Sequence, residues 1–271
     1  MNFKALKENA KNQLKLNSHI ARQAALVKFL VSIALLIPYM LCIYPISANN
    51  QDSSSTPFLF FICLIMIIVL PIFDLAVKAL IAQIAKAHKS DPDKRFTLKD
   101  YFANFNLFGK SILNMLWTEL WIFLWELVVL VPLCIIAAII TYFVLTNTDN
   151  TQLISSILPF IMVIALLPLV IYKAISYSLN IYAIADDTET GVIEAMNISK
   201  AVTKGHRGEL LGFYLSFTGW YILGIITFGI SDIWIEPYMT MSIYNAYKEL
   251  ESTSDSVLVQ PKITSSDNSN A

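Results

Sequence analysis

Lys78, Glu119, Glu126 and Lys173 are charged residues that lie within, or directly after, otherwise apolar blocks of the sequence. Glu119 and Glu126 are seven residues apart, which places them on one face of a helix. Asp74 precedes Lys78 by four residues, a helical spacing at which the two can pair. A charge at the centre of a bilayer costs at least about 2.5–3.5 kcal/mol, so each residue requires a partner or nearby water. Gathered together, the four would form a polar cluster able to grip a lipid head group or relay protons.

A structural role for the same four residues is the alternative. The predicted helix that contains both glutamates is longer than a bilayer requires, so its first turns can extend toward water. Lys78 and Lys173 would then reach the same interface through their aliphatic stems. Glu126 is the hardest of the four to explain in this way, because it lies at least one helical turn deeper. The aromatic belt expected at such an interface would comprise Trp117, Trp121 and Trp125.

A basic turn provides a second candidate site. Lys204, His206 and Arg207 directly precede an apolar block that begins near Glu209. Positive side chains beside the free N–H groups of a helix N-terminus form an anion site, and anionic lipid head groups lie at this depth of a membrane. The alternative is the ordinary excess of Lys and Arg in cytoplasmic loops.

Small residues recur in the block that follows this turn. Gly208, Gly212, Ser216 and Gly219 are spaced by four, four and three residues, so they would share one face of a continuous helix. In lipid, such a face lets a neighbouring helix approach closely. We therefore predict a helix-packing seam along these four residues.

Recognisable catalytic and metal-binding motifs are absent from the sequence. It lacks the His-Glu-x-x-His pattern, a phosphate-binding Gly-x-x-x-x-Gly-Lys-Ser/Thr loop and a Gly-x-Ser-x-Gly elbow. Adjacent Asp186 and Asp187 do not face each other on a helix, and we expect them at a solvated helix end. A net charge of −1 gives no basic character that would suggest nucleic acid. We expect no enzyme, no cofactor, no metal and no nucleic-acid partner.

Long apolar blocks are the elements that must position these residues. Hydrophobic residues make up 56% of the chain and charged residues 14%, against about 45–50% and about 25% in soluble domains. A helix needs about 20 residues to cross a bilayer, and we predict an all-α polytopic bundle of six transmembrane helices. The sixth block is the weakest, because it is short and contains Pro237, and an interfacial or re-entrant last helix is the alternative. The blocks cover approximately 24–46, 58–77, 112–145, 153–172, 209–230 and 233–250.

Lys and Arg predict the orientation of these spans. With the N-terminus inside, all 19 of them, including Lys28, fall in cytoplasmic segments and none in an outer loop, as the positive-inside rule requires. The outer loops then contain four acidic residues and no compensating cation. We predict a multi-pass plasma-membrane protein with both termini in the cytoplasm. The four acidic residues are Asp52, Asp149, Asp232 and Glu236.

Short amphipathic segments suggest an internal repeat. Segments that start at Leu6, Leu98 and Ile193 each precede a pair of apolar blocks, at spacings of 92 and 95 residues. This spacing is consistent with three repeats of a cytoplasmic surface helix plus a hairpin, and repeats in membrane folds often mark an interface with a site. The predicted parts of the chain are a cytoplasmic amphipathic segment (1–22), a six-span membrane domain (23–250) and a disordered polar tail (251–271).

Four segments near the C-terminus carry a family resemblance: KGHRGELLGFYLSFTGW (204–220), ITFGI (226–230), WIEPY (234–238) and AYKEL (246–250). They resemble an uncharacterised family of bacterial integral membrane proteins, catalogued as domain of unknown function number 975. That family looks distantly like the membrane domain attached to some glycerophosphodiester phosphodiesterases. The resemblance implies a membrane module without a hydrolase, and it brings no catalytic residue. The chain departs from the family pattern at Ser231, Asp232 and Glu236.

The sequence leaves three functions to weigh, and the third, an intramembrane enzyme, lacks any recognisable nucleophile or metal set. A non-enzymatic accessory or scaffold protein would act through helix packing and would have no continuous polar path inside. A transporter or lipid-handling protein would instead gather Lys78, Glu126 and Lys173 around a water-accessible cavity in the cytoplasmic leaflet. The expected partners are membrane lipids, anionic ones in particular, and another membrane protein.

Overall fold

The chain folds into helices joined by short turns. The computed structural model describes residues 1–47, 55–147 and 151–258, and no strand occurs among them. The described helices are α1 (Phe3–Leu14), α2 (Ser18–Ser47), α3 (Ser55–Ser90), α4 (Leu98–Ala103), the 3-10 helix η1 (Asn104–Leu107), α5 (Phe108–Asn147), α6 (Thr151–Tyr177), α7 (Asn180–Asp186), α8 (Val192–Thr203), α9 (Arg207–Leu215), α10 (Thr218–Ile226) and α11 (Asp232–Leu258).

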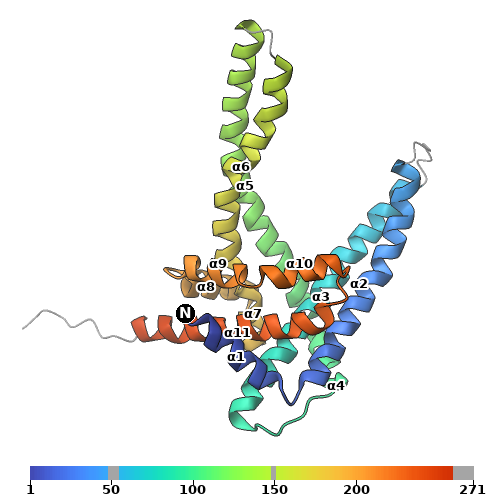
Figure 1. Ribbon diagram of the computed structural model, residues 1–271, viewed down its shortest axis with the longest axis vertical. Coiled ribbons are helices and arrows are strands. Elements are labelled where there is room, and N and C mark those ends of the chain that lie inside the picture. Colours follow the sequence, from blue (N-terminus) through green and yellow to red (C-terminus); the bar gives the residue numbers. More distant parts are fainter. Residues whose placement is uncertain (48–54, 148–150, 259–271) are drawn as a thin grey trace, which may run out of the picture.

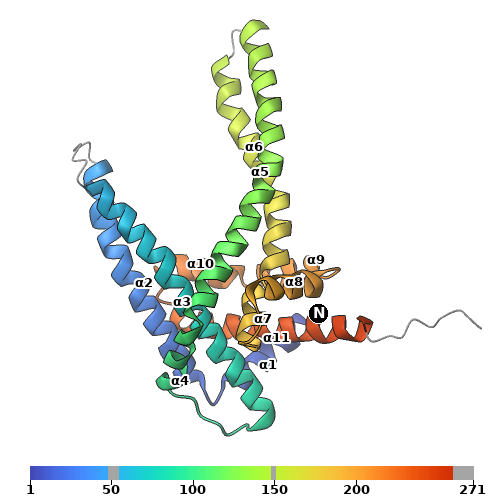
Figure 2. The same ribbon diagram turned by 180° about the vertical axis from the view of Figure 1, so that it is seen from behind.

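Two helical hairpins form long arms that diverge from a common base (Figures 1 and 2). We call α2 with α3 the first arm, α5 with α6 the second arm, and the remaining helices the base. Within each arm the two helices pack along one another. Glycine weakens a helix in water by about 1 kcal/mol relative to alanine, and α2, α3 and α6 contain none. Each of the three forms one long helix, and α3 continues through Pro71.

The buried core lies where the base meets α3. Leu75, Leu80 and Ile84 of α3 are almost fully buried, together with Ile184 of α7 and Tyr247 of α11. α11 contacts α1, α2, α3 and α8, and α3 also contacts α7. The base is thus packed like the interior of a globular protein.

Above this core, the arms expose apolar side chains. Ile37, Phe61, Val128, Ile139 and Ile164 are each more than half exposed. A protein in water rarely presents such extensive contiguous apolar surface, whereas a bilayer would cover it. By length and composition, five stretches of the described chain can cross a membrane: Ser18–Met40, Phe61–Ser90, Leu98–Tyr142, Ile164–Asp186 and Arg207–Ile226.

The sixth predicted span is not one of these five stretches. Its residues belong to α11, which lies across the base instead of standing beside the arms (Figure 1). Tyr244, Tyr247 and Leu250 face the core, while Lys248 pairs with carboxylates. α11 also continues to Leu258, past the predicted start of the tail at residue 251. Residues 259–271 of that tail lie outside the described residues.

The fifth predicted span is interrupted. A continuous helix was expected from Glu209, but α9 ends at Leu215 and α10 begins at Thr218. The hydroxyl of Ser216 donates to the carbonyl oxygen of Phe213 at 2.5 Å, and that of Thr218 donates to Leu215 at 2.6 Å. Local hydroxyls readily bond nearby carbonyl groups in this way, and the carbonyl of Phe213 also accepts from the backbone N–H of Ser216 at 3.1 Å. Both helices lie across the arms (Figures 1 and 2).

Candidate functional site

A cavity of about 520 Å³ lies between α5, α6, α8 and the start of α9. Its lining contains four cations, Lys173, Lys200, Lys204 and Arg207, and no aspartate or glutamate. We call this cavity the basic pocket. The aromatic residues of its wall are Trp121, Trp125, Tyr172 and Tyr177.

Cations of the basic pocket lie against aromatic rings. The Nζ atom of Lys173 is 3.4 Å from the ring centroid of Trp125. The Arg207 guanidinium lies 4.4 Å from the ring of Tyr172 and donates to the Tyr172 hydroxyl at 2.7 Å. The Nε–H of Arg207 is buried without a hydrogen-bond partner among the described residues. Because ring faces accept no conventional hydrogen bond, most donors of these cations stay available to a ligand.

Two of the three residues predicted for an anionic head-group site, Lys204 and Arg207, line this pocket. The third, His206, does not, and its Nδ1 atom lies 3.1 Å from Glu209. Lys173 also lines the pocket, although it was predicted to join a different cluster. Lys200 was missed, yet its position in the last turn of α8, just before Lys204, could have indicated it.

A chain of alternating charges crosses the junction between the first arm and the base. Lys78 and Lys28 both form ion pairs with Asp74, the second at 2.8 Å, and Lys28 pairs in addition with Glu236. We call Lys78, Asp74, Lys28 and Glu236 the ion chain. The predicted pairing of Asp74 with Lys78 occurs. The placement of Lys28 and Glu236 on opposite sides of the membrane was wrong, because the two side chains are in contact.

Two cavities border the ion chain, and Lys28, Asp74 and Lys78 line both. The first, of about 650 Å³, is also lined by Asn114 and Glu119. Asn114 is only 5% exposed, and its Oδ1 atom has no hydrogen-bond partner among the described residues. The second cavity, of about 600 Å³, reaches the acidic residues at the start of α11.

The four residues of the predicted polar cluster are therefore distributed over different places. Lys78 and Glu119 line one cavity beside the ion chain, while Lys173 lies in the basic pocket. Glu126 is half-buried and lines neither of these cavities. Within the part of the chain that the structure describes, no ion pair involves Glu119 or Glu126.

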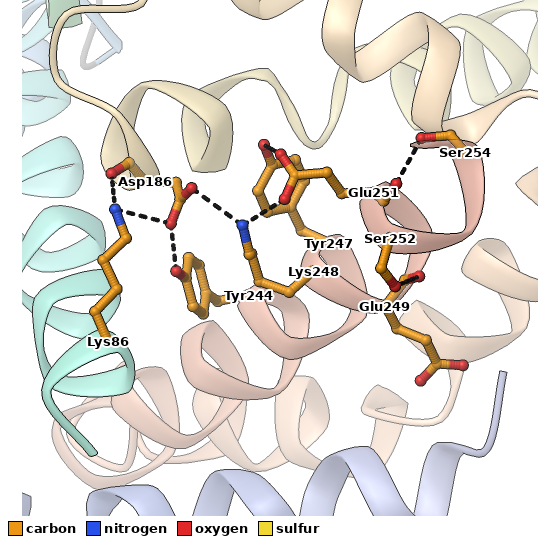
Figure 3. Close-up of polar contacts among 9 residues, drawn as sticks. All are labelled: Lys86, Asp186, Tyr244, Tyr247, Lys248, Glu249, Glu251, Ser252 and Ser254. Carbon is orange, nitrogen blue, oxygen red and sulfur yellow. Dashed lines mark hydrogen bonds and ion pairs between the residues drawn. The ribbon is translucent and has the colours of Figure 1, made fainter. Parts of the chain in front are cut away.

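Asp186 joins α7 to two other helices of the structure (Figure 3). Its carboxylate lies 3.1 Å from Lys86 of α3, and on α11 it accepts from the Tyr244 hydroxyl at 2.5 Å and from Lys248 at 3.2 Å. Burial, together with this hydrogen bond, raises the pKa of the Tyr244 phenol well above its ordinary value. The expected solvated position holds for Asp187, which is exposed. The side chain of Asp186 is only 13% exposed.

The predicted glycine seam is interrupted with its helix. Gly208 and Gly212 belong to α9 and Gly219 to α10. A Cβ atom added to Gly212 would lie 3.6 Å from the ring of Phe3, whereas one added to Gly208 or Gly219 would have no neighbour within 4 Å. Gly212 is thus the one of these three glycines that packs closely against another described element.

Comparisons with known proteins identify a family for this chain but no activity. Among the described residues, no group of three or more His, Cys, Asp or Glu side chains is placed to hold a metal ion. No curated protein and no solved structure matches the chain. A family model with the description "Protein of unknown function (DUF975)" matches residues 1–254. The chain therefore belongs to this family of proteins of unknown function.

Proposed function

We propose that this protein is a non-enzymatic, multi-pass protein of the bacterial plasma membrane that holds an anionic phospholipid head group in the basic pocket. The observation that carries the proposal is the pocket lining, which has four cations and no carboxylate. In this proposal the base lies on the cytoplasmic side with both termini, and the arms cross the bilayer. The distant likeness to the membrane domain of glycerophosphodiester phosphodiesterases is compatible with it.

Electrostatics favours an anionic ligand at this place. Like charges gathered in one cavity repel one another, and the ring contacts of Lys173 and Arg207 offset only part of that cost. A phosphate group would neutralise the cations, and a guanidinium can bind it through two parallel N–H donors. Trp121 and Trp125 in the wall belong to the residue type that anchors proteins at the head-group level.

The arms support the proposed accessory or scaffold role. Their exposed apolar side chains offer broad helical surfaces to lipid or to the helices of another membrane protein. A bound head group at the foot of the second arm would fix the depth and tilt of that arm in the membrane. The protein would thus present its arms to partners in a lipid-dependent geometry.

Transport is the second candidate function, and the ion chain favours it. Lys28, Asp74 and Lys78 of this chain of charges line two cavities at the foot of the first arm. A cargo with hydrogen-bond donors would find the unpartnered Oδ1 atom of Asn114 there, and the carboxylate of Glu119 in the same lining. Uptake of a solute into vesicles that contain the purified protein, lost in the variant Asp74→Asn, would support transport over the accessory role.

Lipid retention tests the head-group proposal. The variant Lys204→Gln/Arg207→Gln is compared with wild type in nanodiscs of phosphatidylglycerol or phosphatidylcholine, with bound lipid measured by native mass spectrometry. We expect wild type to retain phosphatidylglycerol in preference, and the variant to bind it about 30-fold more weakly. Each cation near an anionic surface contributes about 1 kcal/mol, and about 1.4 kcal/mol is a factor of ten.

The matched control removes one lysine and one arginine elsewhere on the base. Arg95→Gln/Lys99→Gln makes the same change of charge at exposed residues outside the basic pocket and should bind as wild type does. A separate measurement adds inorganic phosphate. If the pocket is a site for free anions, phosphate should saturate it and displace the lipid. Equal retention by the pocket variant and wild type would refute the head-group site.

A further inference from the structure

We propose that α10 and the turn to α11 form a membrane-surface hairpin that enters only the cytoplasmic leaflet, so that the chain crosses the membrane four times. The partner of this surface is an anionic lipid leaflet. The inference concerns the C-terminal third of the chain and uses no residue of the basic pocket. It therefore stands or falls independently of the head-group proposal.

Contacts of the α10–α11 turn determine its depth. Glu236, one turn into α11, forms an ion pair with Lys28 of α2. In the turn itself, Gly229 has a φ of +81°, and a Cβ atom there would lie 3.2 Å from the ring of Phe29. Both contacts are on the first part of α2. At 1.5 Å per residue, Lys28 is about 15 Å from the start of α2 and about 28 Å from its end.

A turn on the outer face would have to lie near the far end of α2. Instead it lies beside the half of α2 that begins at the base, next to the cations of the ion chain. α9 and α10 have nine residues each, so each is about 14 Å long, short of the approximately 30 Å of a hydrocarbon core. Neither helix can cross a membrane alone, and the break prevents one straight span.

The exposed side of this hairpin is apolar and aromatic. Tyr221 is 48% exposed, Ile225 77% and Phe228 90%. Phe228 has a φ of +52°, a conformation that a non-glycine residue rarely adopts. Exposure of the Phe228 ring to water is unfavourable, and the positive φ adds a conformational cost. In the acyl region of one leaflet, burial of such a side chain contributes about 1.5–3 kcal/mol.

Cations lie beside this apolar surface. A cavity of about 400 Å³ is lined by Lys11, Lys15 and Arg22 from the N-terminal helices, next to Trp220 and Trp234. No aspartate or glutamate lines it. Cations with tryptophan and apolar residues on one surface are the composition of an interfacial helix on an anionic membrane. The cations and the apolar side chains therefore both favour binding to an anionic lipid surface.

Side-specific thiol labelling tests the four-span topology. Cys42, Cys63 and Cys134 are replaced by alanine, and the segment Gly-Ser-Cys-Ser-Gly is inserted after Ile230 so that its thiol reaches water. A sulfonated maleimide that does not cross membranes is applied to intact cells and to inside-out vesicles. We expect labelling in the vesicles and less than a tenth of it in cells.

Two single-cysteine controls mark the sides. Ser90→Cys, at the base end of α3, should label in the inside-out vesicles. Thr148→Cys, in the loop that the sequence places outside, should label in cells. Labelling of the inserted thiol in intact cells would overturn the proposal and restore six spans. Labelling from neither side, with both controls reactive, would also overturn it, because the turn would then lie deeper than the cytoplasmic leaflet, where the inserted thiol reaches neither aqueous phase.

Discussion

Asp186 is a single carboxylate that joins helices distant in sequence. Its carboxylate pairs with Lys86 of α3 and accepts hydrogen bonds from Tyr244 and Lys248 of α11 (Figure 3). Asp186 itself is the last residue of α7. At 13% exposure the side chain is weakly screened by water. Removing the charge leaves several donors without their strongest acceptor, which costs more than the bond itself contributes.

The substitution Asp186→Asn should therefore lower the free energy of unfolding by about 2–3 kcal/mol. Chemical unfolding in detergent micelles, followed by circular dichroism, measures this change. Asp187→Asn is the matched control, since that exposed carboxylate accepts one local bond from the Glu189 backbone and should change stability by less than about 0.5 kcal/mol. Equal effects of the two substitutions would show that Asp186 does not join the helices as described.

At the scale of the element, the broken segment α9–α10 decides which glycines pack. Gly212 lies against Phe3, whose ring is 5.3 Å from that of Phe213. Gly219, on the other side of the break, has open space where a side chain would stand. The two glycines look equivalent in a continuous helix, and the interruption at Ser216 makes them different.

Gly212→Leu should destabilise the protein by about 1–3 kcal/mol, because the larger side chain displaces the Phe3 ring from the base. Gly212→Ala should be tolerated, since its methyl group would be at ordinary contact distance, 3.6 Å from that ring. Gly219→Leu should stay within about 0.5 kcal/mol of wild type. Thermal unfolding in detergent distinguishes these variants. A large loss of stability in Gly219→Leu would instead support the continuous seam expected from the sequence.

At the scale of the whole molecule, the ion chain connects the C-terminal third to the first arm. Lys28 belongs to α2, Asp74 to α3 and Glu236 to α11, and the side chains of Lys28 and Glu236 are 23% and 21% exposed. Alternation of sign lets each inner charge face two opposite ones. These ion pairs therefore join α11 of the base to both helices of the first arm.

A double-mutant cycle of Lys28→Met and Glu236→Gln should show this coupling. We expect the loss of stability in the double variant to be smaller than the sum of the two single losses by about 1–3 kcal/mol, since the partners are in contact. The cycle is measured by unfolding in detergent. Lys28→Met with Glu126→Gln is the control and should be additive, because no ion pair joins Glu126 to the described residues. Additivity in both cycles would contradict the ion chain.

Local properties of the sequence account for what could be predicted. The long apolar blocks without glycine form α2, α3 and α6, because hydrophobic content and helix propensity act over neighbouring residues. The pairing of Asp74 with Lys78 follows from their spacing on one helix. Lys204 and Arg207 likewise lie together in the basic pocket because they are close in the chain. The family, too, could be recognised from short segments near the C-terminus.

The features that could not be predicted from the sequence depend on contacts between residues far apart in the chain. Lys28 and Glu236 are separated by 208 residues, and no periodicity in the sequence indicates that they meet. The topology predicted from the sequence treats the two C-terminal blocks as spans, although their hydroxyl and charged side chains find partners at the base. The sequence alone determined that the chain is helical, apolar and suited to a membrane. Only the tertiary structure decided which charges share a depth and which helices stand in the arms, because both depend on packing between segments far apart in the chain.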